Sequence, residues 1–273
     1  MTSTILVATD GSEAAATAER FGAEFAGRLK AQLLGVSVVE DRFTRGMAED
    51  GLGIAPPPLD AMAAYLKTRA DASCRRLAVR ARAAGVEHST EVLTGIADDR
   101  IVERGQKADI TVLGRDGQHA AYRTGLIGAT VSGVIRKTAK SALVVPVGVQ
   151  LSGPIMLAFD GSAGSKIGAK LAVQIATRLG EPIHVFVDSK DKGRAIARFD
   201  AVRELVGSLP VPVHEISSTL GRPDVKIVDS AREVRAGLIV MGAYGRNRIT
   251  EYFLGSNASA VVRTSSVAVL LAR

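Results

Sequence analysis

A glycine-spaced loop near the end of the chain carries residue types suited to holding phosphate. Gly242 and Gly245 follow the apolar run 238–241, Leu-Ile-Val-Met, which has the length and composition of a buried strand. Because glycine has no side chain, main-chain N–H groups at these positions can turn toward an anion and approach it closely. Arg246 lies inside the same loop and adds a positive charge. The loop is therefore a candidate anion site.

A predicted helix follows this loop and favours the same ligand. Gly255 and Ser256 come just before the helical segment that starts with Asn257 and runs to Arg263. The N-terminus of a helix presents unpaired N–H groups and the positive end of the helix dipole. The hydroxyl of Ser256 is a further donor at this point, so both ends of the loop predict phosphate binding.

The chain contains one structural unit twice, at an offset of 150 residues. Residues 5–12 read Ile-Leu-Val-Ala-Thr-Asp-Gly-Ser, and residues 155–162 read Ile-Met-Leu-Ala-Phe-Asp-Gly-Ser. Each copy predicts a short buried strand, an Asp-Gly-Ser turn and then an amphipathic helix, with Ser12 and either Ser162 or Ser165 as helix caps. We therefore expect a tandem repeat with domains at 1–150 and 151–273.

Apolar strands alternate with helical segments throughout both repeats. Beyond the first strand of each repeat, the expected strands are 33–39, 86–93, 110–113 and 142–147, and 183–187, 211–216, 238–241 and 267–271. Strands rich in Val, Ile and Leu that alternate with helices indicate a parallel sheet covered on both faces. The fold class is therefore α/β, with two tandem doubly wound, five-stranded, Rossmann-like domains. Ligands of such sheets bind at the carboxyl ends of the strands.

Each repeat ends in a short apolar strand, and an exposed apolar edge tends to be paired or covered. We expect the two final strands or their flanks to meet across a pseudo-two-fold axis. One polypeptide would then pack as an intrachain pseudo-dimer. A further homodimer is left open.

The glycine spacing, Gly-x2-Gly-x9-Gly-Ser, resembles the nucleotide-binding signature of the universal stress protein family. The resemblance covers nearly the whole chain as two fused copies and also includes the Asp-Gly-Ser turns, Gly95 and the segment 221–224, Gly-Arg-Pro-Asp. It implies bound ATP and leaves open whether Mg²⁺ accompanies it. By position, the adenine would lie near Asp160 and the main chain of Val187, and the phosphates would lie near the glycine loop.

The two repeats differ at this signature. In the first repeat Gly114 and Gly117 are followed by a spacer one residue longer, and Ala129 stands where the family pattern has Ser or Thr. Asp116 puts a negative charge beside the expected phosphate position. A like charge at about 4 Å costs roughly 1–4 kcal/mol in a wet or surface site. Thr130, one place further along, could supply the hydroxyl instead. The sequence nevertheless predicts a degenerate site in the first repeat and one ATP in the second.

Charge and composition narrow the choice of partners. Residues 1–150 carry 19 Lys/Arg against 17 Asp/Glu, and residues 151–273 carry 16 against 11, so the second repeat should attract anions more strongly. No clustered basic helix is present and aromatic residues make up only 4%, which argues against nucleic acid as a partner. No apolar run approaches the roughly 18 residues that span a bilayer, and no secretion signal is evident. A cytoplasmic protein with no membrane partner is expected.

Three classes of function fit these observations. The first is an ATP-binding stress or signalling module that acts through conformation or through a protein partner not identified by the sequence. The second is an adenine-nucleotide enzyme, either a slow ATPase or an adenylating transferase; no catalytic residues and no metal ligands with suitable spacing are evident. The third is a scaffold whose ligand is incidental. The single cysteine, Cys74, falls on an apolar helical stripe and is expected to be a buried structural thiol.

Overall fold

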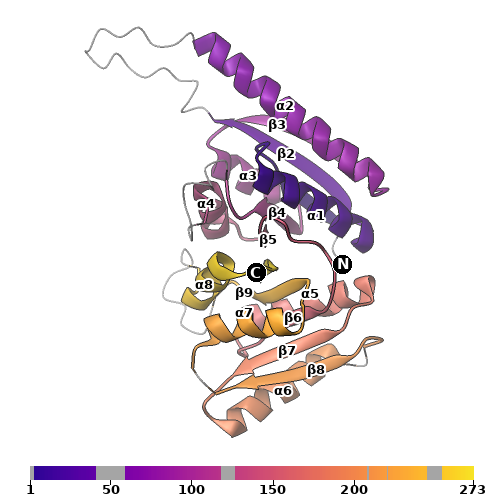
Figure 1. The fold of residues 1–273 in the computed structure, drawn as a ribbon, viewed down its shortest axis with the longest axis vertical. Helices are drawn as coiled ribbons and strands as arrows, with labels where there is room; N and C mark the ends of the chain where they lie inside the picture. The colour runs from indigo at the N-terminus through magenta and orange to yellow at the C-terminus, as the bar shows by residue number, and fades with distance from the viewer. Residues whose placement is uncertain (1–2, 41–58, 118–126, 208, 220, 245–253) are drawn as a thin grey trace, which may run out of the picture.

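The computed structural model describes residues 3–40, 59–117, 127–207, 209–219, 221–244 and 254–273 (Figure 1). Its first half contains β1 (Thr4–Ala8), α1 (Glu13–Leu29), β2 (Gln32–Glu40), α2 (Leu59–Ala83), β3 (His88–Gly95), α3 (Ala97–Gly105), β4 (Ile110–Gly114), α4 (Ala129–Lys137) and β5 (Ser141–Val145). The second half contains β6 (Ile155–Ala158), α5 (Ala163–Leu179), β7 (Ile183–Asp188), α6 (Lys192–Val206), β8 (Val213–Ser218), α7 (Pro223–Glu233), β9 (Leu238–Gly242), α8 (Ser256–Thr264) and β10 (Ala268–Ala272).

The strands form one ten-stranded sheet in the order β3-β2-β1-β4-β5-β10-β9-β6-β7-β8. Within each half all neighbouring strands are parallel. Each half therefore has the doubly wound order predicted from the sequence, and its chain direction across the sheet switches at the first strand.

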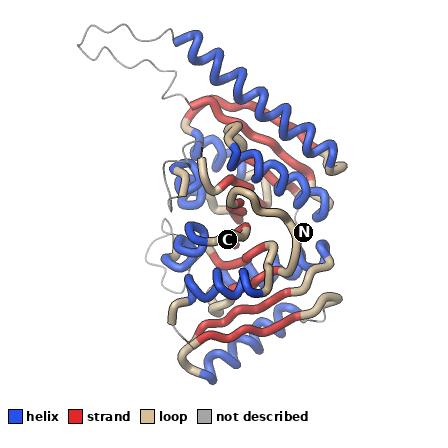
Figure 2. The backbone as a smooth tube through the Cα atoms, viewed as in Figure 1, coloured by secondary structure: helices blue, strands red, loops and turns tan. Residues whose placement is uncertain are grey.

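The two halves join through an antiparallel pair of their last strands. In this pair Val269 lies opposite Val144, and Leu270 lies opposite Leu143. All four side chains are buried, so the junction is part of the core. The halves lie one above the other along the long axis of the molecule, and both chain ends are close to the junction (Figure 2). The prediction that the final strands meet across a pseudo-two-fold axis is confirmed.

Helices cover both faces of the sheet. On one face α1, α2, α5 and α6 pack on alternate strand residues, such as Val7 and Val240. On the other face α3, α4, α7 and α8 pack on the intervening residues, such as Leu6 and Ile239. Strand side chains alternate between the two faces, so one strand supplies both cores. None of the helices in the described parts of the chain is long and apolar enough to cross a membrane.

Local signals set the helix and strand starts. The hydroxyls of Ser12 and Ser162 accept hydrogen bonds from the N–H groups of Ala15 (3.1 Å) and Ser165 (3.2 Å), so both serines cap their helices as expected. The third strand of each half begins two residues later than predicted. The N–H of Val86 closes the end of α2 by donating to Ala81, and Pro212 lacks the N–H that a strand needs.

Candidate nucleotide site

A cavity of about 450 Å³ opens at the carboxyl ends of β6, β7 and β9 in the second half. Its place follows from the topology, because β6 pairs with both β7 and β9 and so lies at the switch point of this half. The volume is within the range of small-molecule pockets, roughly 300–1,000 Å³. The lining combines apolar side chains from the strand ends with a few polar groups from loops and helix starts.

One end of the cavity is built from the start of α8. Ser256, Asn257 and Ala258, the first three residues of this helix, all line the cavity, and so does the preceding residue, Gly255. No side chain among the described residues caps this helix, and the first N–H groups of an α-helix have no acceptor within the helix. This end therefore presents N–H donors, the Ser256 hydroxyl and the positive end of a helix dipole.

Gly242 also lines the cavity, but the structure gives it a packing role as well. A Cβ atom at Gly242 would lie 2.8 Å from the backbone C of Gly164 and 2.8 Å from the backbone N of Ser165, at the start of α5. Gly114 has the same constraint in the first half, where a Cβ would lie 2.8 Å from the carbonyl oxygen of Ala14. The first glycine of each motif is thus needed for close approach of strand and helix.

Asp160 stands at the edge of the cavity in a fixed position. Its Oδ1 accepts a hydrogen bond from the N–H of Ser162 at 2.9 Å, which closes the turn between β6 and α5. Ser162 in turn caps α5. The Asp-Gly-Ser turn therefore holds the Asp160 carboxylate where β6 ends, beside the space that a ligand would fill.

The contact predicted at the end of β7 involves the main chain of Val187 and stays a prediction, while the side chains that line the cavity there are those of its neighbours. The side chain of Val187 is fully buried in the core on the α5 and α6 face. Its neighbours Phe186 and Asp188 line the cavity, together with Arg198 from α6. Strand alternation explains why the side chain of Val187 does not line the cavity, since adjacent residues point to opposite faces. The sequence contained the signal for Phe186 and Asp188, because Val185 and Val187 alternate with them as core residues.

Two of the predicted contacts, Gly245 and Arg246, lie outside the described residues. The remaining predicted residues from the glycine loop and α8, together with Asp160, line one cavity. Tyr244 lines it too and was not anticipated. Within the described parts of the chain, no group of three or more His, Cys, Asp or Glu side chains could hold a metal ion.

The first half has a cavity of about 520 Å³ at the equivalent place. Gly114, Asp116 and Gly128 line it, as do Ala129 and Thr130 at the start of α4. The turn closes as in the second half, since the N–H of Gly128 donates to the carbonyl of residue 115 at 3.0 Å. The first half therefore keeps the shape of the site but changes its chemistry.

Asp116 forms an ion pair with its neighbour Arg115. Arg115 Nε lies 3.2 Å from both carboxylate oxygens of Asp116, and Arg115 Nη1 donates to the carbonyl of Ser265 in the other half at 2.6 Å. The carboxylate still lines the cavity. At the helix start, Ala129 offers no hydroxyl where the second half has Ser256. Both differences make the first cavity less suited to phosphate.

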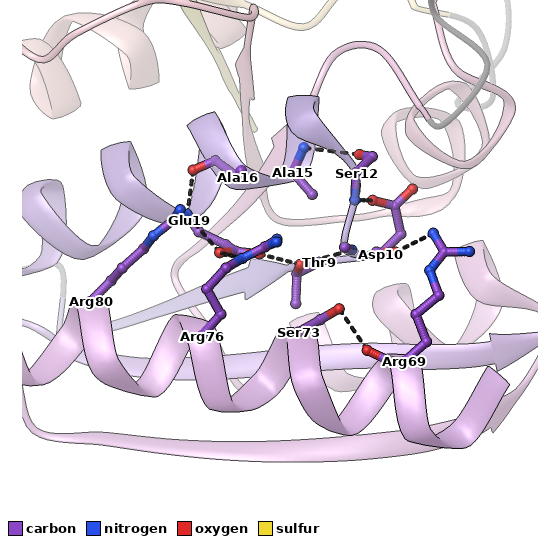
Figure 3. A network of polar contacts seen from close by, with 11 residues as sticks. Thr9, Asp10, Ser12, Ala15, Ala16, Glu19, Arg69, Ser73, Arg76 and Arg80 are labelled. Carbon is purple, nitrogen blue, oxygen red and sulfur yellow. Dashed lines mark hydrogen bonds and ion pairs between the residues drawn. The ribbon is translucent and has the colours of Figure 1, made fainter. Parts of the chain in front are cut away.

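A buried ionic network adjoins the first cavity, whose lining includes Thr9, and Figure 3 shows this network. Glu19, on α1, is fully buried and accepts hydrogen bonds from Arg76 Nε at 2.8 Å and from Arg80 Nη1 at 2.6 Å. The hydroxyl of Thr9 also donates to Glu19. The hydrogen bonding of Arg76 to Glu19 raises the pKa of the Arg76 guanidinium. The network ties α2 to α1 and to the strand end that carries Asp10.

The same helix places Arg69 over the Asp-Gly-Ser turn, where Nη2 donates to the carbonyl of Asp10 at 3.0 Å (Figure 3). The second half has no counterpart of the ionic network among its described residues, because Phe159 and Ala169 occupy the positions equivalent to Thr9 and Glu19. Both halves close the turn with a hydrogen bond from a serine N–H to the aspartate Oδ1, and the first half adds the contact from Arg69.

The second cavity is connected to the first half through its wall. The guanidinium of Arg273 lies over the ring of Tyr244, 4.5 Å from its centroid. Arg273 also donates hydrogen bonds to the carbonyls of Ile135 and Thr138, where α4 ends. Burial lowers the pKa of this arginine. A cavity residue of one half is therefore in contact with a side chain that caps a helix of the other.

Comparison with known proteins agrees with this architecture. A universal stress protein of Synechocystis sp. is 25% identical over 286 residues, covering 98% of this chain and 99% of that protein. A universal stress protein of Mycobacterium tuberculosis is 28% identical over 194 residues, covering 63% of this chain and 64% of its own length. The crystal structure of a universal stress protein from Archaeoglobus fulgidus has a TM-score of 0.78 at 20% identity and covers 99% of this chain and 98% of its own.

The sequence pattern that defines the universal stress protein family matches this chain twice, at residues 1–146 and 152–273. These two matches follow each other within one polypeptide and span nearly all of it. The chain therefore belongs to the universal stress protein family and is a tandem member of it.

Proposed function

We propose that the second half of this protein binds ATP and that the protein acts as a nucleotide-responsive stress or signalling module. The observation that carries the proposal is the cavity at the switch point of the second half, with the uncapped start of α8 at one end. An anion at a helix N-terminus is stabilised by the N–H groups and the dipole.

The residues present fit an adenine nucleotide. In this proposal the phosphates lie against Gly255, Ser256 and Asn257, and the nucleoside lies toward Asp160 and the end of β7. The apolar lining from Phe186 and Met241 suits a base. Mg²⁺, where present, would arrive on the phosphates, which is the usual way proteins bind this ion with nucleotides.

The link between Tyr244 and Arg273 supports a signalling role. A ligand that contacts Tyr244 would bias the position of Arg273, which holds the end of α4 in the first half. In this proposal the bound nucleotide is read out through the arrangement of the two halves, and a cytoplasmic protein partner recognises that arrangement.

Calorimetric titration of the full chain with ATP, ADP and AMP tests the proposal. We expect ATP to bind most tightly, because it places the most negative charge at the start of α8. Ser256→Ala should weaken ATP binding about 10- to 150-fold, since a hydrogen bond to a charged group contributes roughly 1.5–3 kcal/mol. The effect on AMP should be smaller if Ser256 contacts the terminal phosphates.

Ser259→Ala is the matched control, because Ser259 lies one turn further along α8 and does not line the cavity. This variant should bind ATP like the unmodified protein. The absence of ATP binding by the unmodified chain would refute the proposed function. An equal loss of ATP and AMP binding in Ser256→Ala would contradict the placement of the terminal phosphates.

A further inference from the structure

The carboxylate of Asp188 has an unusual place in the second cavity. Asp188 is the last residue of β7 and lines the cavity beside Phe186, which lies two residues earlier on the same face of the sheet. Its Oδ1 is sealed from solvent, and among the described residues no donor forms a hydrogen bond with it. The main-chain carbonyl of Asp188, in contrast, accepts from Arg198 Nη1 at 2.6 Å.

A buried acceptor without a donor destabilises a fold by about 1–3 kcal/mol. The acid at this position is not a shared feature of the two halves, because the equivalent residue in the first half is Val38. The register shows the equivalence: Leu33 pairs with Ile5 as Ile183 pairs with Ile155, and Val38 and Asp188 both come five residues later. Val38 also lines its cavity. The Asp188 carboxylate costs stability, and the first half has valine in its place. We therefore expect this carboxylate to contact a ligand.

The distance from the start of α8 indicates which part of the ligand Asp188 would meet. Strand β6 lies between β9, which leads into the α8 loop, and β7, which carries Asp188. Neighbouring strands are about 4.8 Å apart, so β7 is roughly 10 Å from β9 across the sheet. If phosphate lies at α8, the nucleoside end of the ligand lies over β7.

We propose that Asp188 is a specificity-determining residue that accepts a hydrogen bond from a donor at the nucleoside end of the ligand. This inference rests on the proposed function. The donor is either the exocyclic amine of adenine or a ribose hydroxyl, which share the chemistry that a carboxylate recognises. The terminal torsion of aspartate is broad, so a small rotation brings either oxygen to that donor.

Binding of nucleotide analogues to the full chain tests the inference. ATP is compared with ITP, which lacks the 6-amino group, and with 2′-deoxy-ATP and 3′-deoxy-ATP, which each lack one ribose hydroxyl. The unmodified protein should bind the analogue without the recognised donor about 10- to 100-fold more weakly than ATP. In Asp188→Val, which copies the first half, this difference should fall to about three-fold or less, mainly through weaker ATP binding.

Two further variants complete the test. Asp188→Asn keeps the shape and one oxygen acceptor without the charge, so its discrimination should lie between those of the other two proteins. Asp200→Asn removes the same charge from an exposed site on α6, where Asp200 pairs with Arg203, and should discriminate like the unmodified protein.

The stability of the ligand-free protein distinguishes a ligand-binding role of Asp188 from a structural one. Asp188→Val should unfold at the same temperature as the unmodified protein or higher, because the substitution removes a buried acceptor for which the described part of the chain offers no donor. A clear loss of stability would assign Asp188 a structural role and overturn the inference.

The binding data separate this inference from the proposed function. If ATP binds but the unmodified protein does not discriminate among the analogues, or if Asp188→Val discriminates equally well, only the role of Asp188 is refuted. If ATP does not bind at all, the proposed function is refuted and this inference with it.

Discussion

Glu19→Ala is expected to destabilise the first half strongly. Glu19 is fully buried, and its carboxylate neutralises the guanidinium groups of Arg76 and Arg80 at 2.5 and 2.6 Å. Removing one partner of a buried ionic cluster costs about 3–5 kcal/mol because the remaining charge is left without compensation. The side chains of Arg76 and Arg80 are 37% and 27% exposed, so water recovers part of this loss. We therefore expect the free energy of unfolding to fall by about 2–4 kcal/mol.

Urea unfolding followed by circular dichroism measures this change. Glu24→Ala is the control on the same helix, because Glu24 forms a surface pair with Arg28 at 4.0 Å and should alter the free energy of unfolding by no more than about 0.5 kcal/mol. A triple variant that also replaces Arg76 and Arg80 by Met should be less destabilised than Glu19→Ala alone, since no charge is left uncompensated. A loss below about 1 kcal/mol in Glu19→Ala would refute the reasoning.

Three further predictions concern other parts of the fold. Burial raises the pKa of the Cys74 thiol to about 11, so this thiol should react with a disulfide reagent at pH 8 far more slowly than a free cysteine. Unfolding in urea should restore the usual rate. Fast reaction of the folded protein would contradict the burial of this thiol. For the same reason stability should decline as the pH rises from about 9 toward 11, because only the unfolded thiol ionises readily there, and Cys74→Ala should lessen that decline. Arg273→Ala should lower the free energy of unfolding by about 1–3 kcal/mol, because the carbonyls of Ile135 and Thr138 lose their donor. Thermal melts measure this change, with Arg136→Ala as the control at an exposed site. Equal melting temperatures for the two variants would argue against the contact.

Most of the fold could be predicted from the sequence because the chain contains a repeat. Two copies of a strand, an Asp-Gly-Ser turn and a helix are local signals, and the run of apolar strands between helices leaves few topologies. The junction of β5 and β10 was also predictable, because an apolar edge strand in each half needs a partner. Strand starts were less accessible, as the closure of α2 by Val86 depends on helix geometry and not on hydrophobicity.

The α8 end of the candidate site could be predicted from the sequence, and the rest of the site less well. Gly255, Ser256 and Asn257 lie in one continuous motif, so their proximity follows from the sequence. Phe186, Asp188 and Arg198 come from two elements, and their convergence requires the register of β7 and the packing of α6. In the ionic network around Glu19, Arg76 and Arg80 are 57 and 61 positions away from Glu19 in the sequence. No local sequence pattern predicts contacts over such separations.

The stoichiometry of ATP binding to the full chain tests the central claim most directly. The account predicts one ATP per chain in a calorimetric titration, bound in the second half, with Ser256→Ala weakening that single site. The first cavity should not compete for ATP, because it presents Asp116, Ala129 and Val38 where the second presents Tyr244, Ser256 and Asp188. Two equal sites per chain, or one site that Ser256→Ala leaves unchanged, would contradict the account.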